Sequence, residues 1–208
     1  MIGASLPAGD GRRSGARATA AGDQPAISAM LARAFLDDPI MVFMFPDAAD
    51  RRTKLPRLFQ LLLLSTLPLG GCDVACGVES ASLWRPPGKA GISFWETLLH
   101  LPAILAIYGL AGTRRALRLL GVMDRHHPKE PHWYLMVLGS EPAKQGKGFG
   151  GIVLRHRLAE IDAAHLPAYL EASKPENVPI YARFGFEPRR ELPIPAGPII
   201  YPMWRPAR

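Results

Sequence analysis

Apolar side chains recur along this chain at two spacings, one typical of helices and one typical of strands. Helical spacing or helical composition predicts helices over about residues 23–36, 51–67, 92–123, 148–164 and 178–183. In the first of these, apolar residues return every three or four positions: Ile27, Met30, Leu31, Ala34 and Phe35. Asp37 and Asp38 before Pro39 end that helix. Gly109 and Gly112 divide the third predicted helix into two pieces.

Strand-like segments alternate with these helices. A short strand is predicted near Arg17, and others over about residues 72–78, 81–84, 133–138, 168–172, 186–192 and 199–204. Bulky side chains on both faces of the 133–138 segment indicate a strand at the centre of a sheet. The order of elements predicts an α/β (α+β) fold, in which a mixed, twisted sheet of about six or seven strands is flanked by helices.

Composition predicts one globular domain. The chain has 208 residues, of which 48% are hydrophobic and 21% are charged, enough for one sizeable core. Residues 1–16 lack apolar periodicity and predict a disordered basic tail, so the domain is expected over residues 17–208. The formal net charge of +7 would suit a polyanion. However, the basic residues are scattered without interleaved aromatic residues, and we therefore expect no nucleic-acid partner.

The cysteines and the apolar stretches indicate in which cellular compartment the protein is expected. Cys72 and Cys76 form a CxxxC pair without a second pair, which matches neither a zinc ribbon nor a disulfide-rich secreted scaffold. The longest apolar stretches are too short to span a bilayer, and the N-terminus lacks the apolar core of a signal peptide. We therefore expect a cytoplasmic protein with reduced thiols and no membrane association, although the Arg-rich opening leaves a transit peptide open.

The most informative stretch is WYLMVLGSEPAKQGKGFGG, residues 133–151. It leads from an apolar strand into a glycine-rich turn and then into a helix. Gly146, Gly148, Gly150 and Gly151 remove side chains where backbone N–H groups could converge at the helix N-terminus. The helix dipole also favours negative charge there, so this segment predicts a phosphate site.

Two kinds of phosphate-bearing ligand fit this loop. Gly146, Gly148 and Gly151 satisfy GxGxxG, and Glu171 follows at about the distance of the ribose-binding acid in a dinucleotide fold. Three observations weigh against a nicotinamide enzyme. Six residues separate the strand from Gly146, the motif lies late in the chain, and the later Asn177 and Tyr181 have no role in a dinucleotide fold.

The second kind of ligand is indicated by a family resemblance. Gln145, Gly148 and Gly150 fit the pyrophosphate loop of the GNAT acetyltransferase superfamily, which the chain resembles. The segments HHPKEPHWYLMVLG, AKQGKGFGG, PAYLEASKPENVPIYARFGF and GPIIYPMW are similar to the puromycin N-acetyltransferase group, over roughly residues 126–204. The resemblance implies a single GNAT-like domain with two splayed parallel strands in the middle of its sheet.

The resemblance also implies acetyl-coenzyme A as cosubstrate and assigns residues to it. Backbone N–H groups of the loop would hold the pyrophosphate, and Lys147 would add charge; the loop comprises Gly146, Lys147, Gly148, Phe149, Gly150 and Gly151. The pantetheine arm would pair with the backbone of Leu138, Gly139 and Ser140, and an amide there would polarise the thioester carbonyl. Relatives carry an aliphatic residue in place of Ser140, but a backbone contact should survive this change.

For catalysis, the resemblance points to three side chains, each with a structural alternative. Tyr181 would protonate the departing thiolate, or only pack its ring. Asn177 would bond the pantetheine amide, or cap a helix. Glu171 would deprotonate the amine directly or through a water, or serve as a structural acid beside a Lys or Arg. The His residues lack Cys or acidic partners at metal spacing, and we expect no metal.

The amine acceptor is the least determined part of this prediction. Trp84, Trp95 and Tyr108 would line an aromatic acceptor pocket or belong to the ordinary core. The leading hypothesis is an N-acetyltransferase that acts on a small-molecule amine, such as an antibiotic or a metabolite, by direct attack in a ternary complex. It would work as a monomer or a homodimer. The alternatives are an acyl-coenzyme A sensor without turnover and, less favoured, an NAD-dependent oxidoreductase.

Overall fold

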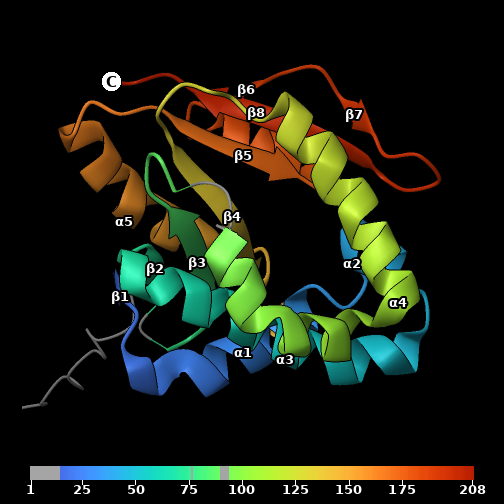
Figure 1. The fold of residues 1–208 in the computed structure, drawn as a ribbon. Helices are drawn as coiled ribbons and strands as arrows, with labels where there is room; N and C mark the ends of the chain where they lie inside the picture. The colour runs from blue at the N-terminus through green and yellow to red at the C-terminus, as the bar shows by residue number, and fades with distance from the viewer. Residues whose placement is uncertain (1–14, 76, 90–93) are drawn as a thin grey trace, which may run out of the picture.

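The computed structural model describes residues 15–75, 77–89 and 94–208 (Figure 1). Cys76, predicted to be a reduced thiol, lies outside the described residues. So does the predicted tail over residues 1–16, except for residues 15 and 16. The helices are α1 (Gln24–Ala34), α2 (Pro39–Met44), α3 (Ala48–Thr66), α4 (Phe94–His126), α5 (Phe149–Ala163) and α6 (Val178–Ala182). The strands are β1 (Ala16–Ala18), β2 (Cys72–Ala75), β3 (Ser80–Arg85), β4 (Trp133–Ser140), β5 (Ala168–Ala172), β6 (Glu187–Pro188), β7 (Leu192–Pro193) and β8 (Ile199–Arg205).

The strands form one mixed sheet, which confirms the predicted α/β class. Their order is β1-β2-β3-β4-β5-β8-β6, and β7 also pairs with β8. The β4–β5 pair is parallel, and the other pairs in the described chain are antiparallel. The short strands β6 and β7 replace the single strand predicted over residues 186–192, because Pro188 and Pro193 cannot donate to a ladder.

The predicted helices are confirmed to within a few residues, with one addition. α1 ends at Ala34, before the predicted stop, and Pro39 instead begins α2. At the first position of a helix the missing N–H of proline costs no intrahelical hydrogen bond. Asp38 caps α2 by accepting a hydrogen bond from the Ile40 N–H at 2.9 Å. The break predicted in the long helix lies at Gly109 (φ 59°), whereas Gly112 remains helical.

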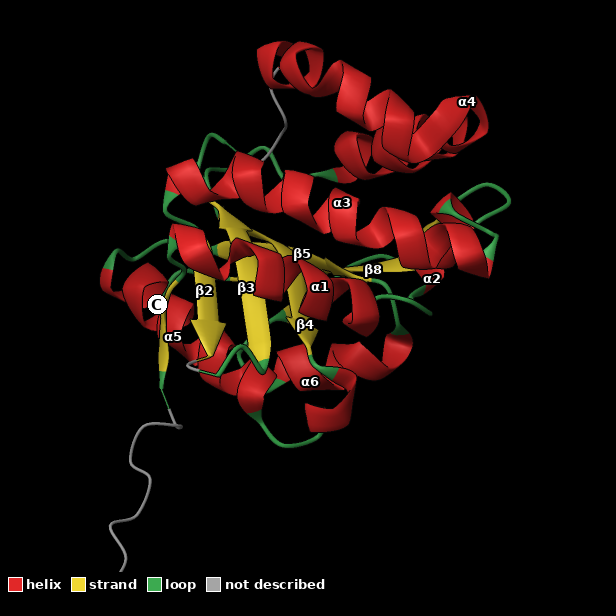
Figure 2. Ribbon diagram, turned by 90° about the horizontal axis from the view of Figure 1, so that it is seen from below, coloured by secondary structure: helices red, strands yellow, loops and turns green. Residues whose placement is uncertain are grey.

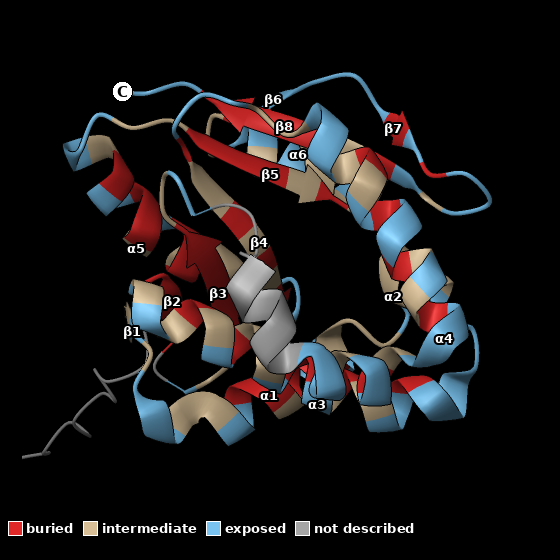
Figure 3. Ribbon diagram, viewed as in Figure 1, coloured by how far each residue is buried: buried red, intermediate tan, exposed pale blue. Residues whose placement is uncertain are grey.

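Helices cover both faces of the sheet (Figures 1 and 2). One buried cluster joins α1, α3 and α4 to β2 and β3, and a second joins α5 to β4, β5 and β8. The strands are mostly buried, and the outer side of α4 faces solvent (Figure 3). Among the helices of the described chain, none is long and apolar enough to cross a membrane. Cys72 is buried as a free thiol, and burial raises its pKa to about 12.

A β-bulge in the central strand β4 changes the face of the sheet to which its later side chains point. Trp84 pairs with Leu135 and Leu83 pairs with Val137, so Met136 is an extra residue on β4. As a result, Leu135 packs in the α5 cluster and Val137 in the α1 and α3 cluster. The parallel pairing of β4 with β5 ends at Leu135 and Leu170, although both strands continue beyond it. The two strands therefore diverge over residues 136–140.

A buried ion pair fixes α5 to the far side of the sheet. Arg157 donates from Nε and Nη2 to the Asp73 carboxylate at 2.8 and 2.7 Å, and from Nη2 to the Gly70 carbonyl at 2.9 Å. Its guanidinium also lies 5.3 Å from the ring centre of Trp133. The Asp73 side chain is fully buried, and Arg157 is its hydrogen-bonded counter-ion, while His156 Nε2 lies farther away at 3.8 Å.

Arg157→Ala should therefore destabilise the protein strongly. Removing one partner leaves the Asp73 charge buried without its counter-ion, and we expect a loss of about 3–5 kcal/mol in the free energy of unfolding. Urea denaturation followed by circular dichroism measures this loss. The matched control is Lys54→Ala, which breaks the more exposed pair with Asp50 and should change stability by less than about 1 kcal/mol. Equal losses in the two variants would show that the buried pair contributes no more to the free energy of unfolding than the exposed pair does.

Candidate functional site

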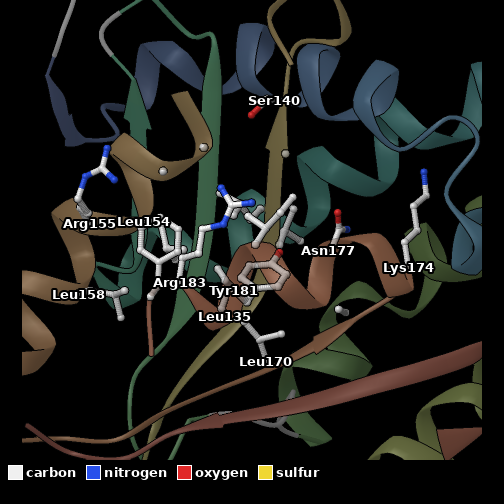
Figure 4. Close-up of a pocket in the computed structure, with 18 of the residues that line it drawn as sticks. Leu135, Ser140, Leu154, Arg155, Leu158, Leu170, Lys174, Asn177, Tyr181 and Arg183 are labelled. Carbon is white, nitrogen blue, oxygen red and sulfur yellow. The ribbon is translucent and has the colours of Figure 1, made fainter. Parts of the chain in front are cut away.

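A cavity of about 1170 Å³ opens where β4 and β5 diverge. Its wall is formed by residues 135–140 of β4, the loop up to the start of α5, residues 170–174, and the α6 segment (Figure 4). Most of the predicted site residues line it: Leu138, Gly139, Ser140, Gln145, Gly146, Gly148, Gly150, Gly151, Glu171, Asn177 and Tyr181. Lys147 and Phe149 lie outside the cavity wall.

The glycine loop presents the start of α5 to this cavity. Gly146 (φ +75°) and Gly148 (φ +84°) have left-handed backbone conformations that side chains disfavour. The first hydrogen bond within α5 runs from the Ile152 N–H to the Gly148 carbonyl at 3.1 Å. The three preceding amides, of residues 149–151, lie at the helix N-terminus, where the helix itself offers no acceptors. These amides form an anion-binding end next to the cavity.

Ser140 and Gly150 bring the end of β4 against the start of α5. A Cβ at Gly150 would lie 3.3 Å from Ser140 Oγ, so the end of the strand and the start of the helix are closely packed at this point. The Ser140 hydroxyl donates to Ser80 Oγ at 3.0 Å, and Gln145 Nε2 donates to the Ser140 carbonyl at 3.3 Å. Ser140 is therefore fixed by its neighbours, and Gln145 links the loop to the strand.

Basic side chains surround the same cavity. Those of Arg155, Lys174, Arg183, Arg205 and Arg208 line it. Figure 4 shows the side chains of Arg155, Lys174 and Arg183 around the space between the strands. Arg205 is paired with Asp162, but the other four add positive potential next to the helix N-terminus. In the sequence these residues look scattered, because they come from four separate segments of the fold.

Tyr181 and Asn177 project from the α6 segment into the cavity (Figure 4). The Tyr181 ring packs edge-on against Phe186, with 6.1 Å between ring centres. Its hydroxyl has no hydrogen-bond partner among the described residues. Burial, and to a smaller extent the charge of Asp38, raise the pKa of Tyr181 above its usual 10, so the phenol stays protonated. Asn177 occupies the cap position of α6 without a side-chain capping bond.

Glu171 lies on the other face of β5 from the α5 cluster. Its neighbours Leu170 and Ala172 belong to that cluster, and side chains alternate along a strand. The Glu171 carboxylate accepts hydrogen bonds from the hydroxyls of Tyr134 (2.6 Å) and Tyr169 (3.1 Å). Its side chain is only 1% exposed. Sequence reasoning expected a Lys or Arg as the structural partner, and instead two phenols fill that role.

Asp38 is a cavity residue that sequence reasoning missed. It lines the cavity at the α1–α2 turn and is only 4% exposed, and the Ser173 hydroxyl donates a short hydrogen bond to its carboxylate. Burial raises the pKa of Asp38, although the bond from Ser173 opposes this. The available signal was an acid directly before Pro39. That signal indicates a helix boundary, and it says nothing of a cavity.

Two of the three aromatic residues suggested for an acceptor pocket, Trp84 and Tyr108, do not line the cavity. Trp84 is fully buried in the core, where its indole N–H donates to Ser82 Oγ at 3.0 Å. Tyr108 stacks on Phe45 with 5.3 Å between ring centres, away from the cavity wall. The side chain of Trp95 lies outside the described part. In the part of the chain that is described, no group of three His, Cys, Asp or Glu side chains is placed to hold a metal.

Comparisons with known proteins give acetyltransferases. No family model matches the chain. An uncharacterized N-acetyltransferase of Schizosaccharomyces pombe is 28% identical over 182 residues, which cover 82% of this chain and 73% of the relative. A Corynebacterium glutamicum structure, described as histone acetyltransferase HPA2 and related acetyltransferase, is 27% identical with a TM-score of 0.74, covering 94% of this chain and 97% of that chain. The polyamine N-acetyltransferase of Drosophila melanogaster has a TM-score of 0.58 at 18% identity, covering 92% and 98%.

The sheet and these likenesses identify the fold. A mixed sheet with a parallel β4–β5 pair at its centre and helices on both faces is the GNAT acetyltransferase fold, which confirms the expected architecture. The Schizosaccharomyces pombe relative and the Corynebacterium glutamicum neighbour are described as acetyltransferases, and the chain is an enzyme of this acyltransferase type.

Proposed function

We propose that this enzyme transfers the acetyl group of acetyl-coenzyme A to the amine of a small molecule. The observation that carries the proposal is the position of the glycine loop. It places the free amides of the α5 N-terminus at one end of a cavity that continues along β4 to Tyr181. A ligand with phosphates at one end and a thioester at the other matches this order of groups.

The residues around the cavity suit the parts of acetyl-coenzyme A. The amides of residues 149–151 would bind the pyrophosphate, and Arg155, Arg183 and Arg208 supply charge for the remaining phosphate. Beyond Leu135, the edge of β4 that faces β5 offers backbone groups to the pantetheine amides. Asn177 adds a side-chain amide on the opposite wall. An N–H at the end of β4 would polarise the thioester carbonyl.

Tyr181 and Glu171 have the chemistry for the two proton transfers. Tyr181 keeps its proton because its pKa is raised, so it would protonate the thiolate as the C–S bond breaks. Glu171 is held by Tyr134 and Tyr169 and would accept a proton from the amine through a water. Both residues come to the cavity where β4 and β5 diverge.

Asp38 indicates the class of acceptor. A buried carboxylate on the wall of the cavity, near the Tyr181 ring, is suited to hold a cationic amine before the amine loses its proton. Solved neighbours include enzymes for polyamine, agmatine and arylalkylamine substrates. We therefore propose a positively charged small-molecule amine, with antibiotic amines such as puromycin among those to be tested. We further propose that the enzyme acts in the cytoplasm as a monomer or homodimer, without a nucleic-acid or membrane partner.

Acetyl-coenzyme A should raise the melting temperature of the protein. A ligand at about 100 times its Kd stabilises the native state by ~2.7 kcal/mol, which for a chain of this size corresponds to roughly 5–10 °C. Differential scanning fluorimetry with acetyl-coenzyme A and with NAD measures this shift. A shift with NAD alone would favour the oxidoreductase. A shift with acetyl-coenzyme A, but no coenzyme A release with any amine of a panel, would favour an acyl-coenzyme A sensor.

Tyr181→Phe should lower kcat without weakening acetyl-coenzyme A binding. Loss of a general acid reduces kcat by roughly 10²- to 10⁴-fold, and the retained ring keeps its packing against Phe186. The wild-type kcat should also show no alkaline loss from Tyr181 between about pH 6 and pH 9, because the phenol has a raised pKa. Tyr201→Phe, on β8 and outside the cavity wall, is the matched control. An unchanged kcat in Tyr181→Phe would leave Tyr181 a packing residue.

Asp38→Asn should raise the KM for the amine and leave the Kd of acetyl-coenzyme A unchanged. Loss of a charge-assisted bond of about 1.5–3 kcal/mol corresponds to an increase of roughly 10- to 100-fold in KM. Asp37→Asn is a close control, since Asp37 is adjacent in sequence but 83% exposed. Steady-state kinetics with the best amine of the panel measures both variants. A fall in kcat at constant KM would instead assign Asp38 to proton transfer.

A further inference from the structure

Five side chains with exchangeable protons gather behind β5, next to the cavity. They are His127, His132, Tyr134, Tyr169 and Glu171. The His127 ring lies edge-on to the rings of Tyr134 and Tyr169, with 5.0 Å between ring centres in both cases. The His127 ring centre also lies 4.9 Å from that of His132. The cluster therefore encloses the one carboxylate that Tyr134 and Tyr169 bind.

The hydrogen bonds of His132 determine which nitrogen of His127 carries a proton. His132 Nδ1 lies 2.6 Å from the Glu130 carbonyl, which can only accept, so Nδ1 carries the proton. Burial lowers the pKa of His132, so the ring is neutral and its Nε2 is an acceptor. His127 Nε2 lies 3.1 Å from that acceptor and must donate to it. In neutral His127, Nδ1 then has a lone pair.

That lone pair faces Glu171. His127 Nδ1 lies 3.9 Å from Glu171 Oε1, and the carboxylate already accepts from Tyr134 and Tyr169. Burial and the Glu171 charge raise the pKa of both tyrosines, so their hydroxyls stay protonated and act as donors. Two acceptors thus face each other at 3.9 Å, and a proton passes between them when the His127 ring approaches Oε1 to hydrogen-bond distance. A proton placed there belongs to Glu171 or to His127.

The exposed fractions of Glu171 and His127 indicate in which direction a proton would leave the pair. The Glu171 side chain is 1% exposed, whereas that of His127 is 20% exposed. A proton on Glu171 has no direct contact with bulk water, but His127 connects it to the surface. The other charged groups acting on the cluster are Arg85 near Tyr134, Arg189 near Tyr169 and Glu130 near His132. Arginines do not release protons in this range, so His127 is the group that can pass one on.

We propose that His127 relays to solvent the proton that Glu171 takes from the acceptor ammonium. This inference rests on the base role proposed for Glu171. An N–H bond of the ammonium breaks as its proton passes to a bridging water, and that water gives one of its own protons to Glu171. The new O–H bond then breaks as an N–H bond forms on His127 Nδ1, once the His127 ring has closed the 3.9 Å gap. The resulting imidazolium gives up one proton to water and becomes neutral again. The amine is left uncharged with its lone pair free for attack. His127 acts through Glu171 and is a positioning residue.

His127→Gln tests the relay through its pH profile. We expect kcat to fall roughly 10²-fold near neutral pH and to recover at higher pH, where hydroxide or buffer base takes the proton. The KM for acetyl-coenzyme A should not change. His126→Gln is the control, because His126 precedes His127 in the chain but is exposed and hydrogen-bonds to the Val122 carbonyl within its own helix. Equal kcat values and equal pH profiles for the two variants would overturn the relay.

A second measurement does not depend on turnover. Nitrogen-15 NMR of histidine-labelled protein reports which ring nitrogen of His127 carries the proton. The hydrogen bond with His132 predicts a proton on Nε2 and a lone pair on Nδ1 in neutral His127. A neutral ring with its proton on Nδ1 would overturn the relay, because Nδ1 could not then accept a proton from Glu171. A protein with the predicted tautomer that acetylates no amine would refute the proposed function and leave the geometry of the pair intact.

Discussion

The site depends on one constraint, the end of pairing between β4 and β5. The bulge at Met136 turns the rest of β4 over, and the ladder with β5 stops at Leu135 and Leu170. Backbone N–H and C=O groups in a buried sheet need partners, and an edge that has lost its neighbour must find them elsewhere. Here the edge lines a cavity. The hydrogen-bonding capacity of the sheet is therefore available to a bound molecule at the centre of the fold.

The same divergence joins two faces of the sheet that would otherwise be separate. On one face, α5 brings the glycine loop against Ser140, and several cations surround its N-terminus. On the other face, the α1–α2 turn brings Asp38 to the same cavity. A continuous sheet would keep an anion site and a buried carboxylate apart. An opened one allows a single ligand cavity to reach both.

The two buried carboxylates Asp73 and Glu171 differ in their hydrogen-bond partners, and the partners determine which role each carboxylate can have. Asp73 is held by the guanidinium of Arg157, which does not give up its proton, so this pair is fixed and structural. Glu171 is held by Tyr134 and Tyr169, with His127 nearby. Neutral hydroxyls satisfy the oxygens without neutralising them. Glu171 therefore lacks the fixed cation that holds Asp73, which is the condition that the proposed base role requires.

The sequence alone determined the order of helices and strands, the mixed sheet and the glycine loop, because apolar spacing and left-handed backbone positions are local properties. It also identified Tyr181 and Glu171 as candidates through a resemblance. The tertiary structure decided what surrounds them. Trp84 proved to be core, Asp38 came to the cavity wall, and His127 came to lie beside Glu171 from a loop 44 positions earlier in the chain. These contacts join distant segments across the sheet, and spacing along one segment carries no information on which residues of another will meet it.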